Sequence, residues 1–176
     1  MNILYLIGMI LLDMSLVLIM FRLYKNNGLL LMYILHIFIS QITINVTYNI
    51  FDFNIVIGSC FYAVMYLIVD MTNEHYGKAA ANSIINIGVF TLIILFIFVY
   101  CTRFLIKVNS DDYSRSFLYL TNNQFRIIIT DIFISYFLFQ KLNVLIFDKI
   151  KKITKEKFLW IRNNASTIIS QVLTAI

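Results

Sequence analysis

Two carboxylates lie one helical turn apart in the segment VDMTNEHYG. Asp70 and Glu74 are separated by four positions, so a helix places both on one face together with Tyr66. Two acids this close disfavour each other's ionised forms, and an arginine, a proton or a hydrogen-bonding ligand is needed between them. The alternative is that the helix has already reached the lipid headgroups here and both acids are solvated. Gly77 follows the pair as a natural helix stop.

A second set of polar residues occupies the segment WIRNNASTIISQVLT. Its members recur at steps of three and four, which predicts a polar stripe along one face of a helix. The stripe comprises Asn163, Thr167, Ser170 and Thr174, with Ser166 and Gln171 at its margins and Asn164 beside its first member. Small hydroxylated residues are also common packing contacts between membrane helices. Two adjacent amides and a glutamine exceed what packing requires, so a polar cavity is expected beside this stripe.

A third polar face is predicted within residues 125–147. A helical step of three and four places five residues on it: Arg126, Thr130, Phe133, Phe137 and Gln140. A guanidinium at one end and an amide nearer the other suit a polar cavity between helices. Snorkelling of Arg126 to the membrane surface is the alternative.

The remaining polar residues give no signal for catalysis or metal binding. His36 and His75 are isolated from each other and from the two cysteines, and Asp13 has no partner that the sequence reveals. P-loop, zinc-protease and nucleophile-elbow motifs do not occur in the sequence. We therefore expect a protein that is not an enzyme and that uses neither a metal nor a cofactor.

The composition excludes a water-soluble globule. Of the 176 residues, 61% are hydrophobic and 13% are charged, and the mean hydropathy is +0.85. These few polar side chains cannot cover the surface of a soluble domain. The expected solvent is therefore a lipid bilayer. The net charge of +5 comes from short connections between apolar runs, which does not favour a nucleic-acid partner.

The apolar runs predict an all-α, polytopic membrane helical bundle that forms a single transmembrane domain. Crossing a bilayer takes about 20 helical residues, and these runs lack the alternation of barrel strands. We place six spans at residues 3–21, 29–46, 53–69, 79–102, 125–147 and 158–176. The segment RLYKNNG separates the first span from the second, and YNIFDFN separates the second from the third.

Lysine and arginine residues predict the orientation of these spans. The first, third and fifth connections hold eight such residues, whereas the second and fourth hold three. Because cytoplasmic loops carry the excess of positive charge, we expect the odd-numbered connections in the cytoplasm. The amino terminus is then outside, in a multi-pass protein of the cell (inner or plasma) membrane.

Three blocks of the chain resemble, in order, signatures of the queuosine precursor transporter family, formerly called putative vitamin uptake transporters. VDMTNEHYGKAA resembles the acidic motif of that family. RIIITDIFISYFLFQKLNVLIFDKIKKIT is similar to its arginine-led helix with a glutamine and a closing basic loop, and KFLWIRNNASTIISQ to its third signature. Together with GLLLMYILHIFISQ near the amino terminus, the resemblance covers nearly the whole chain.

The resemblance implies an inner-membrane protein that imports 7-deazaguanine compounds, such as 7-cyano-7-deazaguanine, for the synthesis of queuosine in tRNA. One carboxylate can accept hydrogen bonds from the ring N–H and the exocyclic amine of such a purine-like substrate, amides can match its other edges, and an aromatic ring can stack on its face. The expected substrate-binding residues are Asp70, Glu74, Tyr66, Arg126, Gln140, Asn163, Asn164, Thr167, Ser170 and Gln171. Tyr76, Gly77, Arg162 and Ser166 also match family positions.

The chain departs from the family pattern in three places. An acidic residue usually follows the glutamine of the second signature, where this chain has Asn143, and an Asp-Thr pair is replaced by Thr174 and Ala175. The family also has another helix after the third block. Without that helix, part of the polar stripe would face lipid. We therefore expect low stability, or association with another subunit such as a second copy of the chain. The alternative function is therefore a non-transporting relative that serves as a membrane interaction subunit.

Overall fold

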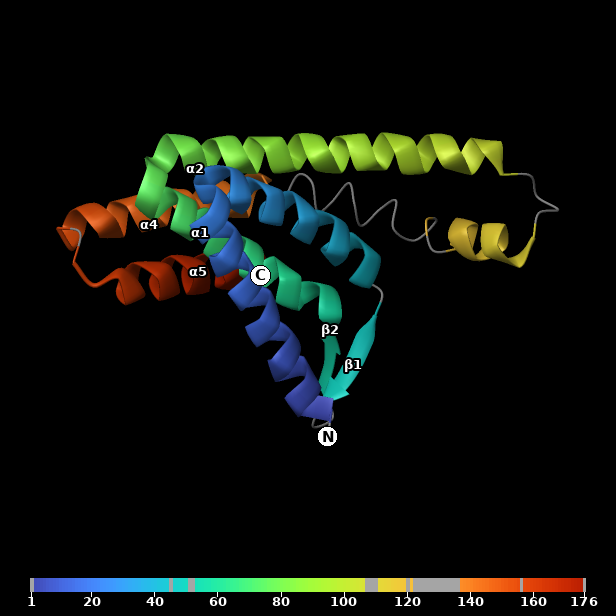
Figure 1. Ribbon diagram of the computed structural model, residues 1–176, viewed down its shortest axis with the longest axis horizontal. Helices are drawn as coiled ribbons and strands as arrows, with labels where there is room; N and C mark the ends of the chain where they lie inside the picture. The colour runs from blue at the N-terminus through green and yellow to red at the C-terminus, as the bar shows by residue number, and fades with distance from the viewer. Residues whose placement is uncertain are drawn as a thin grey trace.

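The computed structural model describes residues 2–44, 46–50, 53–106, 111–119, 121, 137–155 and 157–175. The long helices and the two strands follow each other in the order α1, β1, β2, α2, α4 and α5 (Figure 1). The fold is predominantly helical, in agreement with the composition, but it also contains a β-hairpin that the sequence did not predict.

Helix α1 (Asn2–Thr43) consists of two legs that meet at a bend. Lys25, with φ 55° and ψ −130°, has a non-helical backbone and lies within the segment RLYKNNG. Gly28 follows, and a Cβ atom at this position would collide with the Met20 carbonyl group. A glycine therefore permits the close approach of the two legs.

Helix α2 (Ile57–Leu105) bends once, at Gly77 (Figure 1). This glycine has φ 84° and ψ 169°, a backbone conformation that is essentially restricted to glycine. The bend falls where the sequence predicted a helix stop. It separates the leg that carries Asp70 and Glu74 from the apolar leg that follows Lys78.

The connection between α1 and α2 corrects the predicted third span. Residues 53–56 were expected to begin that span, but Thr47–Ile50 (β1) and Phe53–Val56 (β2) pair as antiparallel strands. The register places Thr47 opposite Val56, and an amide hydrogen bond of 3.2 Å joins Asn49 to Asn54. Both strands are rich in β-branched and aromatic residues, which favour extended backbone. Likewise, α1 ends at Thr43, before the expected end at residue 46.

Helices α4 (Gln140–Ile153) and α5 (Leu159–Ala175) form the carboxyl-terminal part of the structure. The fifth span was predicted to end at residue 147, but α4 continues through the first lysines of the basic segment. Lysine is a good helix former and is favourable in the last turn, where it faces the negative end of the helix dipole. Residues 125–136 of that predicted span lie outside the described part of the chain.

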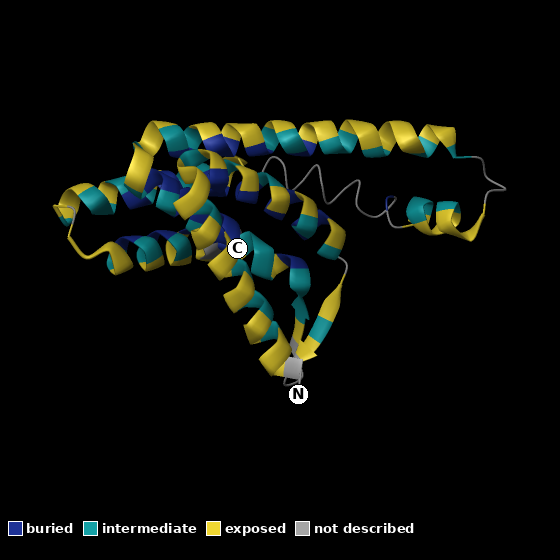
Figure 2. Ribbon diagram, in the orientation of Figure 1, coloured by how far each residue is buried: buried dark blue, intermediate teal, exposed yellow. Residues whose placement is uncertain are grey.

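The apolar core lies mainly between α1 and the two legs of α2. It includes Leu29, Tyr33 and Ile37 from α1 and Ile68 and Ile85 from α2, all fully buried. Elsewhere, long stretches of both helices are exposed, as Figure 2 shows, and many of these exposed residues are apolar. Both are long and apolar enough to cross a membrane, and only 6% and 22% of their most apolar segments are buried. This surface is suited to lipid, whereas the number of crossings stays a prediction.

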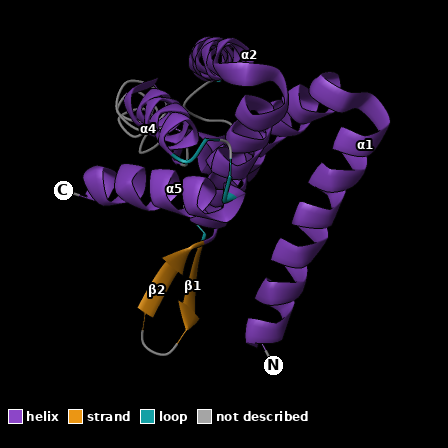
Figure 3. Ribbon diagram, turned by 90° about the vertical axis from the view of Figure 1, so that its left-hand side faces the viewer, coloured by secondary structure: helices purple, strands orange, loops and turns teal. Residues whose placement is uncertain are grey.

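The amino terminus and the β-hairpin lie at the same end of the molecule (Figures 1 and 3). Since α1 starts at this end and returns to it after the bend at Lys25, its two legs run in roughly opposite directions. This arrangement is the one expected for two consecutive membrane crossings.

Candidate functional site

A buried polar cluster lies where α2 meets α4 and α5. The Asn143 Nδ2 atom of α4 donates a hydrogen bond of 2.7 Å to Asp70 Oδ1 of α2. Asp70 is 3% exposed and Asn143 is fully buried. Thr167 of α5 is a polar neighbour of the Asp70 carboxyl group, whose Oδ2 atom is buried without a hydrogen-bond partner. Asp70 thus links three helices that are distant in the sequence.

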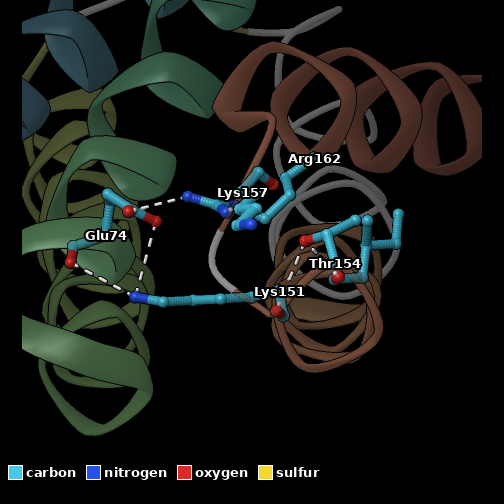
Figure 4. Close-up of polar contacts among 6 residues, drawn as sticks. Glu74, Lys151, Thr154, Lys157 and Arg162 are labelled. Carbon is cyan, nitrogen blue, oxygen red and sulfur yellow. Dashed lines mark hydrogen bonds and ion pairs between the residues drawn. The ribbon is translucent and has the colours of Figure 1, made fainter.

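One turn further along α2, Glu74 binds two cations (Figure 4). The Arg162 Nη2 atom of α5 donates to Glu74 Oε1 at 2.7 Å, and the Lys151 Nζ atom of α4 lies 3.4 Å from Glu74 Oε2. The Lys151 Nζ atom also donates to the Glu74 carbonyl oxygen at 3.4 Å. These contacts attach the ends of α4 and α5 to α2 just before its bend at Gly77.

Arg162 is the central residue of this ion-pair group. Its side chain is 1% exposed, and its Nη1 atom donates to the Lys157 carbonyl oxygen at 3.1 Å. Its guanidinium carbon lies 5.7 Å from the centroid of the Phe147 ring, within the range of a cation–π contact. A buried guanidinium is tolerated because the carboxylate, a carbonyl group and an aromatic face replace its water.

Several amide groups in this region are buried without a hydrogen-bond partner. Neither Nε2 nor Oε1 of Gln140 has one, although Gln140 is 1% exposed. The same holds for Asn143 Oδ1, Asn163 Oδ1 and Asn73 Nδ2. A buried, unpaired polar group costs about 1–3 kcal/mol. Several such groups on facing helices therefore leave donors and acceptors available for a polar ligand.

The structure brings some of the predicted site residues together and separates others. Asp70, Gln140, Asn163 and Thr167 belong to the interface of α2, α4 and α5, and Ser170 of α5 is fully buried. Tyr66 is also buried, and it lies near Tyr33 of α1. Asn164 is exposed, unlike its neighbour Asn163, and does not join the cluster. Arg126 and the side chain of Gln171 lie outside the described part of the chain.

Two members of the cluster were not among the predicted site residues. Asn73 follows Asp70 by three positions and Asn143 follows Gln140 by three, which is the spacing of neighbours on one helix face. From this spacing, Asn73 and Asn143 could have been predicted to lie beside Asp70 and Gln140. Within the described residues, no three His, Cys, Asp or Glu side chains come together as possible metal ligands.

The chain is similar to known proteins over most of its length. Residues 56–176 match the family described as "Putative vitamin uptake transporter". The chain is 28% identical over 127 residues to a protein from Bacillus subtilis (strain 168) called "Probable queuosine precursor transporter". This match covers 72% of the chain and 55% of that protein, so the chain spans about half the length of the curated relative it matches. No solved structure matches.

The apolar exposed helices and the buried polar cluster together define a helical membrane protein. The chain belongs to the putative vitamin uptake transporter family, whose model covers both the acidic segment of α2 and the whole of α4 and α5. The resemblance found in the three sequence blocks is thereby confirmed.

Proposed function

We propose that this protein is a multi-pass membrane transporter that imports queuosine precursors, 7-deazaguanine compounds such as 7-cyano-7-deazaguanine, for tRNA modification. The observation that carries the proposal is the group of buried, unpaired amides beside Asp70, in a chain similar to a probable queuosine precursor transporter. The proposed orientation has the amino terminus and the hairpin outside and the basic segment after α4 in the cytoplasm.

The available groups suit the edges of a deazaguanine. Such a base presents a ring N–H next to an exocyclic amine, and these two donors need acceptors such as Gln140 Oε1 and Asn143 Oδ1. Its carbonyl group needs a donor, which Gln140 Nε2 provides. Neutral amides bind a neutral base without bringing an unpaired charge into the membrane interior.

Glu74 has a different part in this proposal from the one that the spacing alone suggested. Its Oε1 atom accepts a hydrogen bond from Arg162, and its Oε2 atom, which has no hydrogen bond, lies 3.4 Å from the Lys151 ammonium group. Asp70 and the amides are therefore the groups that we propose to contact the base, while Glu74 holds α4 and α5 against α2. The alternative of a non-transporting interaction subunit is not favoured by the family match.

An uptake assay tests the proposal. Cells that cannot synthesise 7-cyano-7-deazaguanine are supplied with the labelled compound, and both cellular label and queuosine in tRNA are measured. Expression of the chain should restore both. Asn163→Leu should reduce uptake, whereas Asn164→Leu, the same change at the adjacent exposed amide, should not. If cells that produce the chain accumulate no more label than cells without it, the proposed transport activity is wrong.

A further inference from the structure

A basic cleft opens between the bend of α2 and the carboxyl end of α4. It has a volume of about 300 Å³ and includes Asn73 and Gly77 of α2 in its lining. Its charged lining consists of Lys78, Lys151, Lys152 and Lys155, with Asp148 as the one acidic residue. Four lysines and one aspartate therefore line the cleft.

The ion pairs of the structure leave part of this charge uncompensated. Lys152 pairs with Asp148 at 3.2 Å, and Lys151 lies 3.4 Å from Glu74. Within the described residues, neither Lys78 nor Lys155 has an acidic partner. Lys78 of α2 and Lys155 beyond the end of α4 thus leave positive charge in the lining of the cleft, which an anion would compensate.

The amide of Asn73 is evidence for a ligand in this cleft that does not depend on the lysines. Asn73 lines the cleft, is 1% exposed, and its Nδ2 atom has no hydrogen-bond partner. An amide N–H group without an acceptor is unfavourable when it is shielded from water. A ligand with several oxygen acceptors would satisfy this donor and the ammonium groups at the same time.

We propose that this cleft binds a phosphate-bearing group at the membrane surface. A phosphate offers several strong acceptor oxygens around one negative centre, which matches a ring of lysines and an amide better than a single carboxylate does. By the predicted orientation, the cleft faces the cytoplasm, where the phosphodiesters of anionic lipids lie at headgroup depth and free phosphate is dissolved. The cleft shares Asn73 with the amide cluster, but neither Gln140 nor Asn143 lines it.

Two binding experiments on the purified full chain distinguish these sources of phosphate. In the first, inorganic phosphate is titrated into the protein in neutral detergent, with chloride at the same ionic strength as reference. In the second, the protein is placed in nanodiscs of phosphatidylcholine and phosphatidylglycerol in equal parts, and retained lipid is identified by native mass spectrometry. Saturable binding in the first arm identifies free phosphate as a ligand, and selective retention of phosphatidylglycerol in the second identifies the lipid.

Matched variants test the assignment to this cleft. Each of Lys78→Gln and Lys155→Gln should weaken binding about fivefold in the arm that shows binding, as expected for the loss of one lysine near a phosphate surface. Lys149→Gln removes a charge from α4 outside the cleft and should leave binding unchanged. Asn73→Asp should also weaken binding, because it replaces the amide donor with a negative acceptor.

The result that would overturn the proposal is equally specific. Either no binding occurs in both arms, or Lys149→Gln weakens binding as much as Lys78→Gln and Lys155→Gln do. Because the two lysines are exposed, their variants should fold even if Asn73→Asp does not. The readout is binding and not uptake, so its outcome does not depend on the transport activity.

Discussion

His36 of the second leg of α1 lies within hydrogen-bonding distance of Asp13 of the first leg. The His36 Nε2 atom lies 3.0 Å from Asp13 Oδ2, and the His36 Nδ1 atom lies 2.6 Å from the Met32 carbonyl oxygen. A neutral imidazole has one N–H group and one lone pair, so it cannot donate to both oxygens. Both contacts can therefore be hydrogen bonds only with one further proton, on the imidazole or on the carboxyl group.

This arrangement predicts opposite outcomes for two substitutions. Asp13→Asn supplies an amide donor to Nε2, so a neutral His36 can satisfy both contacts. Its free energy of unfolding should change by less than about 1 kcal/mol. His36→Leu leaves a largely buried carboxylate without its partner and should cost about 3–5 kcal/mol. Unfolding in detergent measures both, and equal destabilisation by the two variants would contradict the presence of this further proton.

The elements that sequence patterns predicted are those defined by local rules. The bend at Gly77 follows from a glycine after a polar run. Helix α5 begins and ends within one residue of the predicted helix, because its apolar and polar residues both recur with the period of a helix. For the Asp70/Glu74 pair, the spacing indicated an arginine, a proton or a hydrogen-bonding ligand, or else solvation of both acids. Arg162 is such an arginine, from 88 positions away in the sequence.

Other features depend on tertiary structure and could not be read from the sequence. The Asp13–His36 contact exists because α1 folds back at Lys25, within the segment RLYKNNG where the sequence predicted a break, but the sequence did not indicate that these two side chains would meet. The strand Phe53–Val56 is a short apolar run, which by periodicity alone is indistinguishable from the start of a helix. The contrast between Asn163 and Asn164 depends on the rotation of α5 against its neighbours.

Gly77→Ala should destabilise the protein. No atom lies within 4 Å of an added Cβ, so the cost comes from the backbone, whose φ of 84° and ψ of 169° are strained for alanine. We expect a loss of about 1–3 kcal/mol in the free energy of unfolding.

Gly8→Ala is the matched control. An added Cβ at Gly8 also meets no atom within 4 Å, but Gly8 lies within a helix and not at a positive φ. Alanine should therefore stabilise it by about 0.5–1 kcal/mol. Similar effects of the two substitutions, measured by thermal unfolding, would show that the bend does not require glycine.

Gln140→Met should increase stability and reduce uptake. Methionine has a similar size, and the change removes two buried amide atoms that lack partners. The free energy of unfolding without substrate should rise by about 1–3 kcal/mol. Uptake of labelled 7-cyano-7-deazaguanine should fall, because the base loses a donor and an acceptor. A variant that is less stable than the wild type would show that the amide has a structural role instead.

The proposed orientation can be tested with single cysteines. In a variant in which Cys60 and Cys101 are replaced by alanine, a cysteine is introduced at Asn49 of the hairpin or at Lys152 of α4, both exposed. An impermeant maleimide should label Asn49→Cys in intact cells and Lys152→Cys only after permeabilisation. The reverse labelling pattern would place the basic segment outside.

The Glu74–Arg162 pair should contribute strongly to the packing of α5 on α2. Glu74→Gln leaves the buried Arg162 guanidinium without its carboxylate and should cost about 3–5 kcal/mol, whereas Arg162→Met leaves Glu74 paired with Lys151 and should cost less. In a double-mutant cycle with Glu74→Gln, the two effects should not add, with a coupling of about 0.5–3 kcal/mol measured by unfolding in detergent.

The pair Lys152–Asp148, in which the lysine is exposed, is the control for this cycle. Its atoms are 3.2 Å apart, a similar separation, but 78% of the Lys152 side chain is exposed. Solvent screening should limit the coupling of Lys152→Gln with Asp148→Asn to about 0.5 kcal/mol or less. The two cycles differ in burial, since Arg162 is 1% exposed. If the Glu74–Arg162 cycle shows a coupling no larger than the control, the ion pair does not hold α5 against α2, and the position of the polar stripe must depend on the apolar contacts of α4 and α5.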